Sequence, residues 1–228
     1  MKKIPACILL IFTIMTHSCK KEATPINDEH PYGDDVIGIE DKVYGYSQLK
    51  VGNYWIYQEF DLDSAGTIAT PTNVYDSCYI KKDTIIRGNT YYKIMAPAFT
   101  TYFNNFFIRD SADCIVRNTG EVEFSLSNFS TELYSAAFLN GFPPADTVYT
   151  ASVWMKDKDK QVTVPAGNFS TINSQITFHM YPPVNTAGTY RYGNRLFAQN
   201  VGMVLTTKPF AASLSSYKEL RLVRYHLN

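Results

Sequence analysis

Most of the chain consists of short runs in which hydrophobic and polar residues alternate, separated by Gly, Pro, Asn and Asp. The first long run, Tyr54–Phe60, is rich in aromatic residues and follows the turn signal Gly52-Asn53. A period of two places one set of side chains on a core face and the other toward solvent, which is typical of a β-strand. Further runs of this kind cover residues 74–81, 83–87, 90–95, 102–110, 114–118, 121–126, 147–156, 161–164, 170–181, 190–199, 201–207 and 218–227.

Several segments between these runs carry residues that suit tight turns. Gly88-Asn89 separates one pair of predicted strands, and Asn118-Thr119-Gly120 separates another. Because Gly and Asn adopt positive φ at low cost, both segments are typical of β-hairpins and predict antiparallel pairing. The charged stretch Asp157–Lys160 also lies between two strand-like runs, and we predict that it forms a solvated hairpin tip.

The segment Asp61–Gly66 matches the opening of a calcium-binding loop. The twelfth position counted from Asp61 is Thr72, where such a loop needs a bidentate Glu. The pattern therefore favours a hairpin turn over a calcium site.

One segment has helical spacing. Within Thr131–Asn140, the apolar residues Leu133, Ala137 and Phe138 recur at intervals that suit one helix face, and Gly141 follows as a stop signal. The sequence thus predicts a mostly β protein: an antiparallel curved sheet, of half-barrel or sandwich-like form, with one short helix.

The N-terminal residues 1–18 have the pattern of an export signal. Two lysines are followed by the apolar run Ile4–Met15, which is shorter than the ~20 residues that span a bilayer as a helix. Thr16–Cys19 resembles the lipobox of bacterial lipoproteins, and the resemblance implies that Cys19 is lipidated and attaches the protein to a membrane. The alternative is ordinary secretion, with Cys19 left as a plain thiol.

Residues 19–46 are rich in Pro, Gly and acidic residues and have little apolar periodicity, so we predict an acidic flexible tether. Its acidity resembles the surface-export signal of Bacteroidota lipoproteins, although Lys20 and Lys21 come first. The resemblance leaves open whether the protein faces the periplasm or the cell surface. The remaining residues, 47–228, are predicted to form a single β-rich domain.

Charge excludes one class of partner. The 228-residue chain has 21 Lys plus Arg and 21 Asp plus Glu, so its formal net charge is zero. Nucleic-acid binding needs a dense basic field, and the balanced composition argues against it.

Two cysteines remain once the signal and Cys19 are set aside, namely Cys78 and Cys114. In an oxidising compartment they can form a disulfide, which would contribute ~3–4 kcal/mol through the entropy of the unfolded chain. The alternative is two separately buried thiols that behave as small hydrophobic side chains.

The mature chain offers little catalytic chemistry. Its histidines are His30, His179 and His226, and none has a carboxylate or Cys at metal-ligand spacing, so we predict no metal site, no cofactor and no catalytic residue. Trp55 and Trp154 are candidate ligand-facing aromatics, although burial in the core is the more common place for large aromatic side chains.

Four short motifs carry a resemblance to a protein family. They are residues 49–57 (LKVGNYWIY), 164–169 (VPAGNF), 200–204 (NVGMV) and 219–223 (ELRLV). The chain resembles a widespread group of uncharacterised Bacteroidota outer-membrane lipoproteins. The resemblance implies a curved β fold, and it implies no reaction.

These observations favour a lipid-anchored lipoprotein of the outer membrane that acts as a non-enzymatic binding or structural module. An alternative is a periplasmic carrier that shelters an apolar ligand in a concave sheet. A glycan-active enzyme is a third alternative, and it would need two carboxylates facing one cleft about 5–9.5 Å apart. The partners left open are a glycan, an apolar ligand and an envelope protein.

Overall fold

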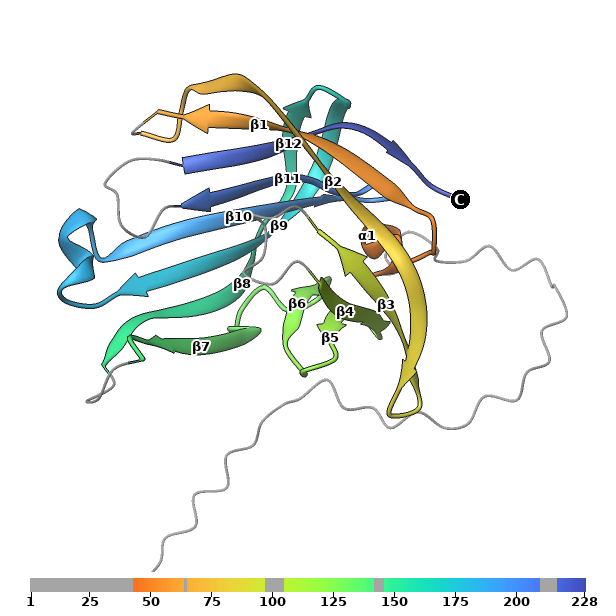
Figure 1. The fold of residues 1–228 in the computed structure, drawn as a ribbon, viewed down its shortest axis with the longest axis horizontal. Helices are drawn as coiled ribbons and strands as arrows, with labels where there is room; N and C mark the ends of the chain where they lie inside the picture. Colours follow the sequence, from red (N-terminus) through yellow and green to blue (C-terminus); the bar gives the residue numbers. More distant parts are fainter. Residues whose placement is uncertain (1–42, 64, 97–104, 142–145, 210–216) are drawn as a thin grey trace, which may run out of the picture. The chain divides into compact units, whose positions relative to one another are not determined.

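The computed structural model describes residues 43–63, 65–96, 105–141, 146–209 and 217–228. Its strands form one antiparallel sheet of 12 strands that curves into a nearly closed barrel (Figure 1), which confirms the predicted fold class. The helices are α1 (Tyr44–Ser47) and the short 3₁₀ turn η1 (Val184–Ala187). The strands are β1 (Tyr54–Leu62), β2 (Ala69–Ile86), β3 (Asn89–Met95), β4 (Asn105–Ser111), β5 (Cys114–Arg117), β6 (Val122–Ser125), β7 (Tyr134–Leu139), β8 (Thr147–Val164), β9 (Gly167–Met180), β10 (Tyr190–Ala198), β11 (Gly202–Pro209) and β12 (Tyr217–His226).

The strands form two meanders that join in the middle of the sheet, where the first and the last strand pair. The strand order is β6-β5-β4-β3-β2-β1-β12-β11-β10-β9-β8-β7, so every hairpin joins neighbours and the first strand lies beside the last. β6 and β7, which follow one another in the chain, are the two edges of the sheet. Closure of the barrel therefore depends on contacts that bring the β6 edge toward the strands at the other end of the order.

The predicted hairpin at Gly88-Asn89 forms, but its turn is shifted by one residue. Arg87 and Gly88 have φ values of 51° and 78°, and Ile86 pairs with Asn89, so the two-residue turn is Arg87-Gly88 and Asn89 already belongs to β3. The loop after β1 is also a hairpin turn, as expected, because the Asp63 carboxylate accepts hydrogen bonds from the backbone N–H groups of Thr67 and Ile68 at 2.6 and 2.9 Å.

The predicted helix over Thr131–Asn140 is wrong, since this segment contains strand β7. The Asn128 side chain accepts a hydrogen bond from the backbone N–H of Thr131 at 3.1 Å, which forms a local turn before the strand. Phe138 then stacks on Tyr149 of β8, with ring centroids 4.9 Å apart. Pairing with β8 has overridden a weak helical preference.

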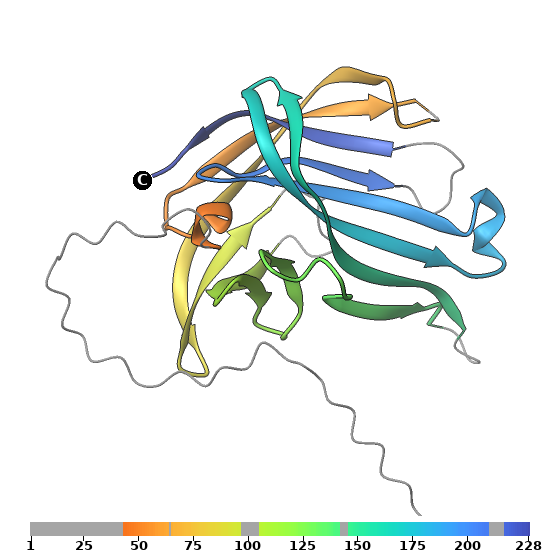
Figure 2. The same cartoon turned by 180° about the vertical axis from the view of Figure 1, so that it is seen from behind.

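The charged stretch Asp157–Lys160 is not a hairpin tip but a bulge within the 18-residue strand β8. The register shifts between Lys156 and Lys160, and Asp157 and Asp159 adopt positive φ values of 47° and 62°. A bulge bends a strand and increases its twist. The far end of the β8–β9 hairpin accordingly bends toward β12, where the Ala166 backbone N–H donates to the Leu222 carbonyl at 2.9 Å (Figure 1; Figure 2).

The folded domain begins earlier than the sequence suggested. Val43 and Tyr46, assigned to the tether, are 2% and 8% exposed and belong to the hydrophobic core. The rest of the predicted tether, together with Cys19 and the signal at residues 1–18, lies outside the described residues. Among the residues that the structure does describe, no helix has the length and apolar character to cross a membrane.

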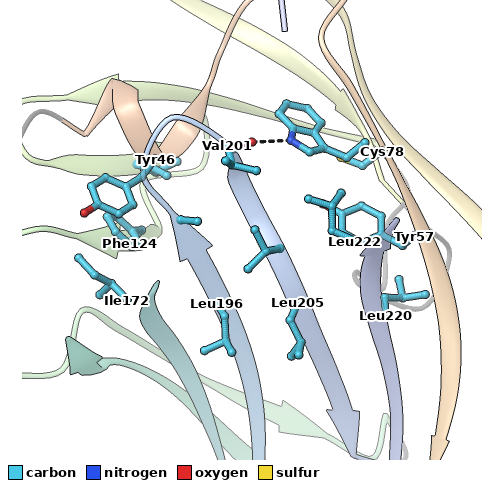
Figure 3. Close-up of a cluster of buried hydrophobic side chains, with 14 of the residues drawn as sticks. Tyr46, Tyr57, Cys78, Phe124, Ile172, Leu196, Val201, Leu205, Leu220 and Leu222 are labelled. Carbon is cyan, nitrogen blue, oxygen red and sulfur yellow. Dashed lines mark hydrogen bonds between the residues drawn. The ribbon is translucent and has the colours of Figure 1, made fainter. Parts of the chain in front are cut away.

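The core fills most of the concave side of the sheet. Tyr57, Phe124, Val204, Leu220 and Leu222 are each at most 1% exposed, and they converge from strands on both sides of the β1–β12 junction. Figure 3 shows part of this cluster and a dashed line from an indole nitrogen to the Val201 carbonyl. The line marks the hydrogen bond that the Trp55 indole N–H donates to the Val201 carbonyl at 2.6 Å.

Gly202 allows this aromatic side chain to approach the backbone. Its φ is +97°, and a Cβ at this position would lie 3.2–3.3 Å from three atoms of the Trp55 indole. Positive φ and close contact together favour glycine here over any other residue.

We expect Gly202→Ala to lower the free energy of unfolding by about 2–4 kcal/mol, because the substitution adds core overpacking to backbone strain. Gly88→Ala is the matched control, since φ there is +78° but no atom lies within 4 Å of the added Cβ. It is expected to cost about 1–2 kcal/mol from strain alone. Urea denaturation monitored by tryptophan fluorescence measures both, and equal losses would contradict the contact with Trp55.

Candidate functional site

A half-open cavity of about 110 Å³ lies inside the curved sheet. Its lining comes from β1 to β6 on one side and from β10 and β11 on the other, so it occupies the interior between the two arms of the meander. The lining is Ser47, Trp55, Tyr57, Cys78, Ile94, Ala96, Phe106, Ile108, Ile115, Arg117, Glu123, Arg195, Phe197, Met203 and Thr206. Most of this surface is aromatic or aliphatic, which suits an apolar guest.

The apolar wall is held rigid by hydrogen bonds behind it. The Trp55 indole N–H donates to the Val201 carbonyl, and the Tyr57 hydroxyl donates to the Met203 carbonyl at 2.7 Å. Both rings therefore turn their polar atom toward the backbone of β11 or of the turn residue just before it. Burial strongly raises the pKa of the Tyr57 phenol, so this hydroxyl stays protonated.

One part of the cavity wall is ionic. Glu123 of β6 forms ion pairs with Arg117 of β5 and with Arg195 of β10. Arg195 also donates to the Ser174 hydroxyl at 2.8 Å, and that hydroxyl donates to the Glu123 carbonyl at 2.6 Å. We call Arg117, Glu123, Ser174 and Arg195 the ion cluster. It connects β6 with β9 and β10 across the interior.

Electrostatics fix the charge of this cluster. Burial alone would raise the pKa of Glu123, but the two neighbouring guanidinium groups and their hydrogen bonds outweigh it and hold the pKa below its ordinary value of 4.5. Glu123 is therefore ionised at neutral pH. Among the described residues that line the cavity it is the one carboxylate, so the cavity lacks the pair of facing acids that glycoside hydrolysis requires.

The two tryptophans do not come together. Trp55 is 4% exposed, so it belongs to the core and also lines the cavity. Trp154 lies on the outer side of β8, where its indole N–H donates to the Ser152 hydroxyl at 3.1 Å and the Lys156 ammonium lies 5.2 Å from the ring centroid. The sequence singled out both residues but could not show that they occupy opposite faces of the sheet.

The structure contains Cys78 on β2 and Cys114 on β5 as separate buried thiols, and the disulfide that the sequence left open is not formed. Burial, followed by the charge of Asp76, raises the pKa of the Cys78 thiol to about 12. Although Cys78 lines the cavity, a thiol in this state is a poor nucleophile at neutral pH.

The described histidines pack against aromatic rings. The His179 ring lies 4.9 Å from Tyr190, and the His226 ring stacks on Tyr54 at 5.6 Å. Over the described ranges, no cluster of three or more His, Cys, Asp or Glu side chains has a geometry suited to a metal ion. His30 lies outside those ranges.

Sequence reasoning missed the ion cluster. Glu123 and Arg195 are 72 residues apart, and Glu123 sits in a short run that reads as an ordinary strand with polar residues facing solvent. The alternation Glu121-Val122-Glu123 suggests that both acids share one face of the strand. In the structure β6 begins at Val122, and its register with β5 shifts at Glu123, since Val122 pairs with Val116 and Phe124 pairs with Ile115. This β-bulge re-aims the Glu123 side chain, and the sequence pattern does not reveal it.

Comparisons with known proteins give no family for the chain. No protein-family model and no curated protein matches it. Among solved structures, a protein from Parabacteroides distasonis named as a lipoprotein is 12% identical, covers 82% of this chain and all of its own, and has a TM-score of 0.37. A protein from Bacteroides fragilis named as an exported protein with a YmcC-like fold is 13% identical, covers 79% of this chain and 98% of its own, and has a TM-score of 0.35.

We expect Glu123→Gln to lower the free energy of unfolding by about 3–5 kcal/mol, because it leaves the buried guanidinium of Arg195 without its counter-charge. Glu121→Gln is the matched control. Glu121 directly precedes β6, its side chain is a quarter exposed, and its carboxylate lies 3.6 Å from the Arg117 guanidinium. Loss of this exposed ion pair should lower the free energy of unfolding by less than about 1 kcal/mol. Chemical denaturation at pH 7 measures the difference.

The same pair of variants tests the pH dependence. A carboxyl whose pKa is lowered by folding stabilises the folded state above pH 4.5, and that stability is lost as the pH falls through the lower folded pKa. Unfolding midpoints of the native protein and of Glu121→Gln should fall across this acid range. A Glu123→Gln profile as steep as theirs would show that another group is responsible.

Proposed function

We propose that this protein is a lipid-anchored protein of the cell envelope whose β domain is a non-enzymatic binding module for a small, mostly apolar ligand. The observation that supports binding is the interior cavity of about 110 Å³ with its aromatic and aliphatic wall. The envelope address rests on the lipobox-like Thr16–Cys19 and the export signal before it.

Cavity size limits the ligand. An engineered protein cavity of about 150 Å³ with an aliphatic and aromatic lining binds benzene or xenon. A cavity of similar size suits a single ring or a short branched chain, and the surrounding core residues are tightly buried. The cavity volume therefore fits a compact apolar group, and a longer ligand would extend out of the open side of the cavity.

The charged part of the wall favours binding over catalysis. Glu123 is engaged by two arginines, and the Cys78 thiol is protonated at neutral pH. A general base or nucleophile needs a pKa near the working pH and a reactive atom turned toward the substrate. Glu123 instead joins β6 to β5 and β10 through its two arginine partners.

We expect xenon to bind in the cavity of the native protein. Ala96→Leu should abolish xenon binding, because the larger side chain fills the cavity. The ¹²⁹Xe chemical shift, followed as protein is added, reports occupancy. Ala137→Leu is the matched control, since Ala137 is exposed on β7. Equal xenon signals from the native protein and Ala96→Leu would contradict an accessible cavity.

We expect Cys19→Ala to abolish metabolic labelling with palmitate and to move the protein out of the membrane fraction, because it removes the acylated residue. Cys78→Ala is the matched control, as its thiol is buried in the domain, and it should keep both the label and the membrane association. Labelling that survives Cys19→Ala would disprove the proposed anchor while leaving the xenon experiment unaffected.

A further inference from the structure

The outer face of β8, β9 and β10 presents side chains in ordered rows. The register pairs Thr150 with His179 and His179 with Tyr190, so these three form one row across the strands. The His179 ring lies 4.9 Å from the ring of Tyr190 and 4.5 Å from that of Tyr181. His179 thus contacts two tyrosine rings, and Tyr190 at the end of the row is 52% exposed.

The next row lies two residues further along each strand, about 6.8 Å away. It pairs Ser152 with Thr177 and Thr177 with Tyr192. Two hydroxyls therefore stand beside a second ring, and Tyr192 is 46% exposed. The exposed tyrosines of the two rows share one face of β10.

The third row pairs Trp154 with Gln175 and Gln175 with Asn194. The Gln175 side-chain amide donates to Asn194 at 3.1 Å, and Asn173 donates to the same oxygen at 2.9 Å. These bonds fix the directions of the amide groups before any ligand arrives, which lowers the entropy cost of binding.

Charge distinguishes these three rows, which we call the outer platform, from an ordinary surface. Its nine positions include no Asp, Glu, Lys or Arg, whereas a typical surface with 25–35% charged residues would place about two or three there. Lys156 borders the platform beside Trp154. A highly charged ligand thus finds neither a cluster of opposite charge nor a buried counter-ion.

We propose that the outer platform binds a neutral glycan. A sugar ring has one face of C–H groups, which stacks on an aromatic ring, and a rim of hydroxyls, which exchange hydrogen bonds with amides and hydroxyls. The platform supplies both kinds of group on the outer face of three neighbouring strands, with an aromatic ring in every row. This site is separate from the interior cavity.

The test is affinity electrophoresis of the full-length protein through gels that contain hydroxyethylcellulose, galactomannan or dextran. The protein is kept in lauryldimethylamine oxide, a detergent without a sugar head group. At least one neutral polymer should retard the native protein. The double variant Tyr190→Ala/Tyr192→Ala should weaken that retardation about tenfold, because two stacking surfaces are lost.

Tyr75→Ala is the matched control, because Tyr75 is 57% exposed on β2, away from the platform, and the variant should bind as the native protein does. A second measurement uses Trp154, since Trp55→Phe leaves it as the one tryptophan, and its fluorescence should change when the retarding polymer is added. Absence of retardation by all three polymers, equal retardation of the double variant, or retardation by heparin alone would overturn the proposal.

Discussion

Closure of the sheet depends on an interaction between charged groups that are 72 residues apart. Glu123 on the edge strand β6 is bound by Arg195 of β10 and Arg117 of β5, and Ser174 of β9 completes the connection. Removing charges from water is costly, so such a cluster stabilises a fold only when its geometry satisfies each member. Here it determines which strands the β6 edge can approach.

The apolar core and the ion cluster divide the interior between them. Core side chains from both arms of the meander meet around the β1–β12 junction, where Tyr57, Leu220 and Leu222 are fully buried. The ion cluster fixes the distance between β6 and the strands β9 and β10. The cavity lies between these two regions, because rigid groups on both sides keep the remaining space from collapsing.

Strands and hairpins could be predicted because they depend on local patterns. Alternation identified nearly every strand, and Gly88 marked a turn because positive φ has a local chemical signature. The errors occurred where pairing with a distant strand determines the local structure. The segment 131–140 reads as helical by spacing, yet β7 forms because β8 offers a pairing edge, and Asp157–Lys160 becomes a bulge because β9 continues alongside it.

The site could be predicted only in part, for a related reason. Trp55 and Trp154 were recognisable as unusual residues, but strand parity decides which faces inward, and parity after several bulges cannot be read from composition. Arg117, Glu123 and Arg195 each look like ordinary strand polar residues. Their common role arises from the β-bulge at Glu123 and from the curvature of the sheet, neither of which a short motif encodes.

The position of β1 in the middle of the sheet has a consequence for how the protein is made. β1 pairs with β2, which is synthesised shortly afterwards, but its other neighbour is β12, which comes last in sequence order among the twelve described strands. Until Tyr217–His226 emerges, one long side of β1 has unsatisfied backbone groups, and contacts of such high sequence separation form slowly. A chain of this topology thus carries an exposed, aggregation-prone seam until β12 pairs with β1, which is the interval in which a chaperone holding Tyr54–Leu62 would have the greatest effect.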